Sequence, residues 1–323
     1  MIITNRTDIP LPIQVWAIND NYDYVEDSAY FSVTQLLKPV RQIVLQKRVD
    51  YDSLTKDVED YLATAMGNSI HDSVEKAWKQ NYKKCLMQLG FNENVVAKYK
   101  INPVKEELNE GDIPIYLEQR SVREMNGYKI GGKFDFVANG LLHDIKSTTT
   151  MKYKKGSSDK DYQLQGSLYR WLNQDIIEDD FIRISFVFTD WSKLNALKDP
   201  SGYPQTRSLY KDIPLLSVEE TEKWLSNKLD SIKKYMDTEE KDLPKCTDEE
   251  LWRTPTVYKY YSNPAATRAT KNFDSYTEGY KYWQFDKKGV GVLRTVVGEA
   301  RRCKYCSASS ICSQYKEMCG GTN

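Results

Sequence analysis

The sequence predicts a mixed α/β (α+β) fold in which a long helix is followed by three antiparallel strands, a second helix and a further strand. Three observations support this order. Apolar residues recur with helical spacing from Asp57 to about Leu89. Asn-Gly pairs at 126–127 and 139–140 separate strand-like segments, and this dipeptide suits the positive φ angles of a type I′ hairpin turn. The segment from Phe181 to Asp190 is apolar and β-rich, as expected of a buried strand.

Length and charge limit the classes of protein to consider. The chain has 323 residues, which we expect to form an N-terminal extension (1–56), a core (57–240) and a C-terminal region (241–323). Its 46 basic residues balance 46 acidic ones, so any nucleic-acid contact must use a local patch. No apolar run approaches the roughly 20 residues of a membrane helix, and no signal-peptide pattern is present. We therefore expect a cytoplasmic protein without membrane contact.

The first elements carry one candidate ligand. Ser32 predicts the N-cap of a short helix that runs through Leu37. In the long helix, His71 and Glu75 share a face beside an apolar stripe. A lone histidine in such a place is more often a packing residue than a metal ligand. The stripe consists of Leu62, Met66, Ile70, Val74, Ala77 and Trp78.

The strands carry the main candidate site. After a polar connection (90–113), we expect strands over Ile115–Glu124, Tyr128–Ala138 and Leu141–Ser147. Because strand side chains alternate between faces, Asp144 and Lys146 point the same way, and the hairpin brings Asp135 towards them.

Two neighbouring carboxylates with a lysine have two interpretations. Carboxylates that lie close together repel each other, and an oxygen cage of this kind suits Mg²⁺ or Mn²⁺. Lys146 beside the cage can orient a water or hold a phosphate. The alternative is a solvated hairpin with an Asp-Lys pair on its wet face. Glu118, on the first strand, reaches the cage or faces water.

The following segments add polar residues. We expect a loop over Thr148–Lys160 whose lysines contact phosphates or solvent. The second helix spans about Asp161–Gln174 and places Gln165 and Tyr169 on one face. Val218–Met236 predicts an amphipathic helix. Residues 246–302 interleave aromatic and basic side chains, which suits single-stranded nucleic acid or a small aromatic core with a basic rim.

Four of the six cysteines, Cys303, Cys306, Cys312 and Cys319, lie in the last 21 residues. This crowding favours a metal or a cluster over disulfide bridges.

Four motifs, in order, resemble the RecB-like branch of the PD-(D/E)XK nucleases. They are Gly67-x3-His71, Gly132-x2-Asp135, Asp144-Ile145-Lys146 and Gln165-x3-Tyr169. The resemblance covers roughly residues 30–190 and implies a restriction-endonuclease-like αβββαβ core. It also implies that His71, Asp135, Asp144 and the Ile145 carbonyl bind a divalent metal and that Lys146 positions the attacking water. Gln165 and Tyr169 would hold the lysine or DNA, and Glu118 matches a less regular acidic position.

The tail resembles the iron-sulfur members of this branch, which include AddB, CRISPR-adaptation nucleases and phage exonucleases. Cys303-x2-Cys306-x5-Cys312 is similar to their C-terminal triplet, which holds a [4Fe-4S] cluster. In those proteins the fourth cysteine usually precedes the core, but no cysteine precedes His71 here. Cys246 is the candidate, because its segment, together with the triplet, resembles cluster-bearing phage exonucleases. The alternatives are a four-cysteine zinc site that uses Cys319, and unligated reduced cysteines.

The resemblance implies a metal-dependent deoxyribonuclease that acts on DNA ends, more as an exonuclease than as an endonuclease. Single-stranded or end-containing DNA would be its substrate, and replication or recombination proteins are candidate partners. A phage-encoded protein of this kind would act in the host cytoplasm. Two alternatives remain: an inactive DNA-end-binding or scaffold protein on the same fold, and a zinc-ribbon adaptor. The complete His-Asp-Asp-Lys set argues against the first, and the second explains the tail but leaves the hairpin unexplained.

Overall fold

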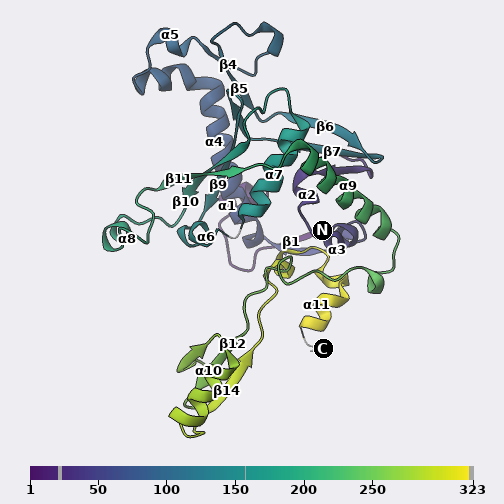
Figure 1. Cartoon of the computed structure of the whole chain (residues 1–323), viewed down its shortest axis with the longest axis vertical. Coiled ribbons are helices and arrows are strands. Elements are labelled where there is room, and N and C mark those ends of the chain that lie inside the picture. Colours follow the sequence, from purple (N-terminus) through teal and green to yellow (C-terminus); the bar gives the residue numbers. More distant parts are fainter. Residues whose placement is uncertain (21–23, 157, 320–323) are drawn as a thin grey trace. The chain divides into compact units, whose positions relative to one another are not determined.

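The computed structural model describes residues 1–20, 24–156 and 158–319. The chain divides into two compact units (Figure 1). Unit 1 comprises residues 1–37 and 50–231, and unit 2 comprises residues 38–49 and 232–323. Helices and strands alternate along both, and the mixed α/β class predicted from the sequence is confirmed. In the described part of the chain, no helix combines the length and apolar character that crossing a membrane requires.

Unit 1 is built on a six-stranded sheet with the strand order β11-β10-β9-β8-β5-β4. The central strands β5, β8 and β9 are antiparallel, whereas β10 runs parallel to β9 and β4 parallel to β5. The strands are β4 (Tyr99–Ile101), β5 (Ile113–Leu117), β8 (Phe136–Ala138), β9 (Leu141–Thr148), β10 (Phe181–Phe188) and β11 (Ser208–Pro214).

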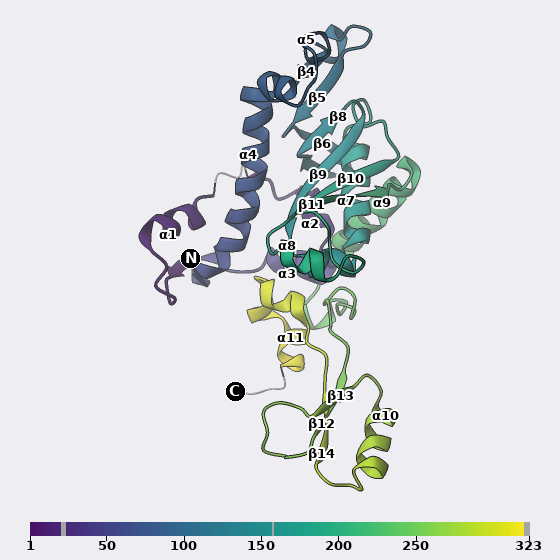
Figure 2. The same cartoon turned by 90° about the vertical axis from the view of Figure 1, so that its left-hand side faces the viewer.

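A second sheet of three strands has the order β2-β7-β6. It comprises β2 (Tyr30–Ser32), β6 (Arg120–Met125) and β7 (Tyr128–Lys133), and a separate parallel pair joins β1 (Ile2–Thr4) to β3 (Thr55–Asp57). Helix α7 (Asp159–Leu172) contacts strands of both larger sheets, and α4 (Glu59–Gln88) contacts β9. Both helices stand beside the strands in Figure 2. The remaining helices are α1 (Leu11–Ile18), α2 (Val33–Leu36), α5 (Glu93–Val96), α6 (Thr150–Lys155), α8 (Lys193–Lys198) and α9 (Val218–Tyr235), whose last turn enters unit 2.

Several predicted elements form where the sequence places them. Ser32 caps α2 through a capping box with Gln35. Both Asn-Gly pairs adopt positive φ at both residues, 52° and 78° at Asn126-Gly127 and 46° and 88° at Asn139-Gly140. These turns therefore have the backbone signs of type I′ hairpin turns.

Other expectations are wrong. The segments Ile115–Glu124 and Tyr128–Ala138 are each two strands, because the first crosses from the six-stranded to the three-stranded sheet and the second crosses back. The expected loop after Thr148 contains helix α6, because Thr149 caps its first turn and Gly156 ends it in the left-handed conformation. The expected connection 90–113 contains α5 and the edge strand β4.

Unit 2 contains a three-stranded antiparallel sheet, β13-β12-β14, and a cysteine-rich end. Its strands are β12 (Val257–Tyr261), β13 (Lys271–Phe273) and β14 (Val292–Val296), and its helices are α3 (Val40–Gln46), α10 (Tyr276–Lys281) and α11 (Ser313–Met318). Val44 and Leu45 of α3 pack with Leu243 and Ala308 in one small core, so a segment from the N-terminal part of the chain completes this unit.

Candidate functional site

Two neighbouring strands of unit 1 break at the same level. Between β5 and β6, Glu118 has a φ of 51°, which is uncommon for a residue other than glycine. Its backbone N–H donates to the Asp135 carbonyl, which lies in the break between β7 and β8, at 3.1 Å. The Phe134 N–H donates to the Gln119 carbonyl at 3.3 Å. The paired breaks therefore hold Glu118 and Asp135 side by side.

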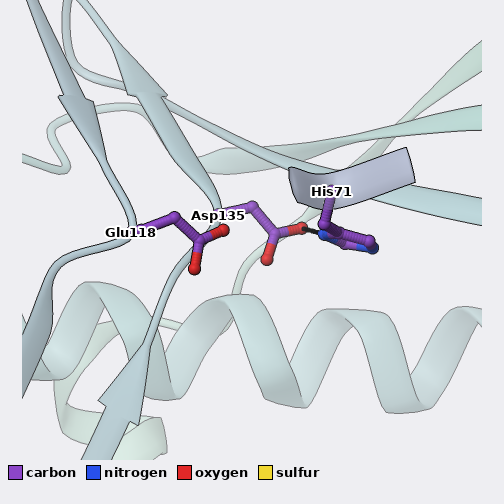
Figure 3. Close-up of side chains that lie close together, drawn as sticks. All are labelled: His71, Glu118 and Asp135. Atoms are coloured by element: carbon purple, nitrogen blue, oxygen red, sulfur yellow. Dashed lines mark ion pairs between the residues drawn. The ribbon is translucent and has the colours of Figure 1, made fainter. Parts of the chain in front are cut away.

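His71 of α4 completes a group of three potential metal ligands with these two acids. One ligand atom from each of His71, Glu118 and Asp135 lies within 4.8 Å of the other two. Nδ1 of His71 is 3.1 Å from Oδ2 of Asp135. The carboxylate of Glu118 points towards Asp135, and that of Asp135 points towards His71 (Figure 3). The same Oδ2 accepts a hydrogen bond of 3.1 Å from the Ile145 backbone N–H, which ties the group to β9.

A second group lies on β9 and α7. Nζ of Lys146 is 2.9 Å from Oδ1 and 2.7 Å from Oδ2 of Asp144, as the strand alternation predicts. Nε2 of Gln165 donates to Oδ1 of Asp144 at 3.0 Å and lies 3.4 Å from the Tyr169 hydroxyl. Asp144 is only 2% exposed, and its Oδ2 accepts no hydrogen bond of good geometry despite the close ammonium. A buried acceptor in this state is suited to a cation.

Tyr169 explains the glycine in the second motif. A Cβ added to Gly132 would lie 2.7 Å from the Tyr169 ring and 2.8 Å from Val33. Only glycine lets β7 approach α7 this closely. Gly67 differs, since an added Cβ would lie 3.5 Å from Oγ of Ser147, an ordinary contact.

The buried charges shift one another's pKa values. The hydrogen bond with Asp135 raises the pKa of His71. Burial acts to raise the pKa of Asp135, but the hydrogen bond and charge of His71 outweigh it, so this pKa is lowered. Burial raises the pKa of Asp144 and that of Glu118. Burial also acts to lower the pKa of Lys146, but the charges of Asp144 and Asp135 outweigh it and raise the pKa. Buried carboxylates such as these are stabilised in their charged form by a nearby positive charge.

The structure groups the predicted site residues in two sets. His71, Glu118 and Asp135 converge, whereas Asp144 stands outside this trio and contacts Lys146 and Gln165. The sequence reasoning did not name Lys133, whose Nζ lies 2.6 Å from Glu118. The sequence feature that points to Lys133 is its place two residues before Asp135, at the end of β7. The first set offers an imidazole and two carboxylates, and the second offers one carboxylate held by an ammonium group. Such ligands suit a hard divalent cation beside a fixed positive charge.

The four cysteines proposed as cluster ligands line one pocket in unit 2. Cys246, Cys303, Cys306 and Cys312 all face it, whereas the exposed Cys319 is not among the lining residues. Gln314 holds Cys246 in place, because its side-chain amide bonds both the N–H and the carbonyl of that residue at 2.8 Å. Burial raises the pKa of the Cys246 thiol to about 12, so a thiolate here requires compensating positive charge.

Basic side chains of unit 2 surround these sulfurs. Nε of the buried Arg41 donates to Sγ of Cys312 at 3.3 Å, and Arg302 also lines the pocket. Four sulfurs with nearby cationic donors have the chemistry required by an iron-sulfur cluster whose ligands are all thiolates.

Known proteins resemble this chain only distantly, and only at the level of structure. No family model and no curated protein matches the sequence. The crystal structure of SSO0001 aligns over 67% of this chain and 83% of its own length, with 14% sequence identity and a TM-score of 0.41. The crystal structure of a phage-related exonuclease from Haemophilus somnus 129PT aligns over 52% of this chain and 80% of its own length, with 17% identity and a TM-score of 0.25. Both TM-scores are too low to indicate a function.

Proposed function

We propose that this chain is a divalent-metal-dependent deoxyribonuclease of the RecB-like PD-(D/E)XK type that cleaves phosphodiester bonds at DNA ends. One observation carries the proposal: helix α4 and the paired strand breaks place one ligand atom each from His71, Glu118 and Asp135 within 4.8 Å of one another, beside a strand that carries Asp144 and Lys146. A solvated Asp-Lys pair does not explain why Asp144 is buried or why its Oδ2 atom accepts no hydrogen bond.

The residues of the site would divide the work. A bound Mg²⁺ or Mn²⁺ supplies a Lewis acid and lowers the pKa of a water molecule. His71, Glu118 and Asp135 would hold the ion, together with Oδ2 of Asp144 and the Ile145 carbonyl. Lys146 keeps its proton, because its pKa is raised, and its ammonium can donate to the attacking water or to a phosphate oxygen. Gln165 and Tyr169 fix Asp144, and through it Lys146.

The proposal includes a structural [4Fe-4S] cluster held by Cys246, Cys303, Cys306 and Cys312. The shared pocket of the four cysteines and the hydrogen bond from Arg41 to Cys312 support it. Cys319, the extra cysteine that a compact zinc site would need, is exposed. Such a cluster would contribute folding energy to unit 2 rather than chemistry at the metal site.

The test compares linear and circular DNA. Anaerobically purified protein is incubated with Mn²⁺ and either end-labelled linear DNA or covalently closed circles. We expect loss of the linear substrate alone. Asp135→Asn should reduce the rate more than about 100-fold, since even the outer partners of metal ligands cost about 10–100-fold.

A matched control is Asp212→Asn, which removes a partly exposed carboxylate paired with Arg183 on the same sheet. This variant should cleave like the wild type. DNA binding without cleavage by the wild-type protein would contradict the proposal and favour an inactive end-binding protein. Cleavage by Asp135→Asn at the wild-type rate would contradict the proposed location of the active site.

A further inference from the structure

The small sheet of unit 2 forms a module with α10 that the proposed active site does not use. Strands β12, β13 and β14 pair in register, and α10 contacts all three (Figure 2). A π-helical segment, Tyr282–Asp286, continues α10. Residues 257–296 contain seven basic and three acidic residues, a formal charge of +4 in a chain whose net charge is zero. This module is therefore a local basic region.

The aromatic residues of the module separate into a core group and a surface group. Tyr260 and Tyr261 are 1% and 7% exposed and form the interior. Tyr276, Tyr280 and Phe285 are 53%, 40% and 71% exposed. A small aromatic core therefore exists, but it does not account for the rings on the surface.

Two of the surface rings, Tyr276 and Tyr280, form a row with two half-buried rings. Tyr276 and Tyr280 are four residues apart, and their rings stack with centroids 5.8 Å apart at an interplanar angle of 29°. Tyr280 contacts Trp283, one turn further on, at 5.7 Å, and Tyr258 of β12 contacts Tyr276 at 5.6 Å. The ring row of Tyr258, Tyr276, Tyr280 and Trp283 thus follows the i, i+4, i+7 face of the helix and its π-helical continuation.

Cations lie around the ring of Tyr282, the residue before Trp283 in the π-helical segment. Nζ of Lys271 and Nζ of Lys287 lie 4.5 Å and 5.2 Å from the Tyr282 ring centroid, and Lys281 is exposed on α10. Among the described residues, none of the seven basic side chains of the module forms an ion pair with a carboxylate. The basic residues are Lys259, Arg268, Lys271, Lys281, Lys287, Lys288 and Arg294.

We infer that the ring row and its lysines bind single-stranded nucleic acid as a second contact surface of the enzyme, an inference that rests on the proposed function for its biological use. Rings offer their faces to unstacked bases, while unpaired ammonium groups neutralise phosphates. A duplex keeps its bases stacked inside and offers these rings only its edges. An acidic strand with exposed aromatic bases therefore matches both the charge and the rings of this face.

The experiment measures binding without cleavage. Full-length protein in EDTA is titrated into a fluorescent oligothymidylate of about 20 nucleotides and into a duplex of the same length, and anisotropy is followed. The oligothymidylate should bind more tightly. Tyr276→Leu combined with Tyr280→Leu should weaken its binding about tenfold or more, because leucine keeps apolar bulk but offers no ring face. Lys281→Ala should reduce the slope of log affinity against log salt by about 0.7.

Two controls keep the test decisive. Tyr280→Phe retains the ring and should bind like the wild type. Tyr51→Ala removes a ring of similar exposure, 48%, from unit 1 and should also bind normally. If the leucine variant is folded and binds the oligothymidylate as tightly as the wild type, the inference is overturned and the face is free to contact a protein instead.

The outcomes separate this inference from the proposed function. Ring-dependent binding by a protein that never cleaves DNA in Mn²⁺ supports the inference and contradicts the nuclease. Cleavage by a protein whose oligothymidylate binding ignores the rings supports the nuclease and contradicts the inference.

Discussion

At the scale of single residues, strand alternation predicts one half of the site and misses the other. Period-two alternation places Asp144 and Lys146 together, and in the structure their charged groups are in contact. Glu118 owes its place to a left-handed φ that no residue pattern announces, since its segment has the composition of a continuous strand. The sequence therefore predicts which acids belong to the site better than it predicts which of them converge.

Lys146→Arg should lower the cleavage rate at least about tenfold. A planar guanidinium cannot place its charge where the compact ammonium lies between the two oxygens of Asp144. The Mn²⁺-induced rise in melting temperature should persist, because Lys146 is not a ligand. Cleavage assays and thermal melts test this. The control is Lys129→Arg, which changes a lysine of β7 that forms an ion pair with Asp27. Near-normal cleavage by Lys146→Arg would show that any positive charge suffices at this position.

His143, on the opposite face of β9, should make the protein less stable in mild acid. Burial, assisted by the charge of Arg183, lowers its pKa to about 4 from an ordinary value of 6.5. Between these two values the unfolded chain binds a proton that the folded chain does not, so stability falls as the pH drops from about 6.5 to about 4. The loss should be about 2 kcal/mol at pH ~5.

Urea unfolding of the wild type and of His143→Gln at both ends of this range measures the effect. The glutamine variant should lack this part of the pH dependence. An identical pH profile for the two proteins would contradict a neutral, partly buried His143.

At the scale of elements, local turn chemistry is predictable and the exchange of strands between sheets is not. Asn126-Gly127 and Asn139-Gly140 require only their own residues to form turns. By contrast, β6 and β7 belong to the three-stranded sheet, where β7 pairs with β2, about a hundred residues earlier in the chain. No local pattern indicates that partner, so the sequence predicts one continuous strand where the structure has two.

Gly132→Ala should destabilise the protein, whereas Gly67→Ala should not. The first substitution forces a methyl group against the Tyr169 ring and Val33, which costs about 1–3 kcal/mol. The second adds a methyl with ordinary contacts inside helix α4 and should be neutral or stabilising by up to about 1 kcal/mol. Chemical denaturation compares them. Cleavage should also fall in Gly132→Ala, because Tyr169 contacts Gln165; equal stability of the two variants would contradict the packing described for β7.

At the scale of the whole molecule, unit 2 joins segments that are distant in the chain. Arg41 of α3 is 3% exposed, donates to the Leu243 carbonyl and to Ser313, and forms an ion pair with Glu240. The spacing of the cysteines is visible in the sequence, but contacts between residues 38–49 and residues some two hundred positions later leave no local mark. A division of the chain into consecutive segments is all that composition supports.

The cysteine pocket makes the prediction that belongs to this scale. Protein purified without oxygen should be brown, contain about four irons per chain and absorb near roughly 400 nm. Cys246→Ser should remove the colour, because its thiolate closes a long loop onto the triplet, and should make residues 232–323 sensitive to protease together with residues 38–49. Cys319→Ser should keep both the colour and the protease resistance, since Cys319 is exposed and outside the pocket lining. Iron and zinc analysis, visible spectra and limited proteolysis of the three proteins measure this. Colourless protein with one zinc, in which Cys319 is essential and Cys246 dispensable, would replace the cluster with a compact zinc site.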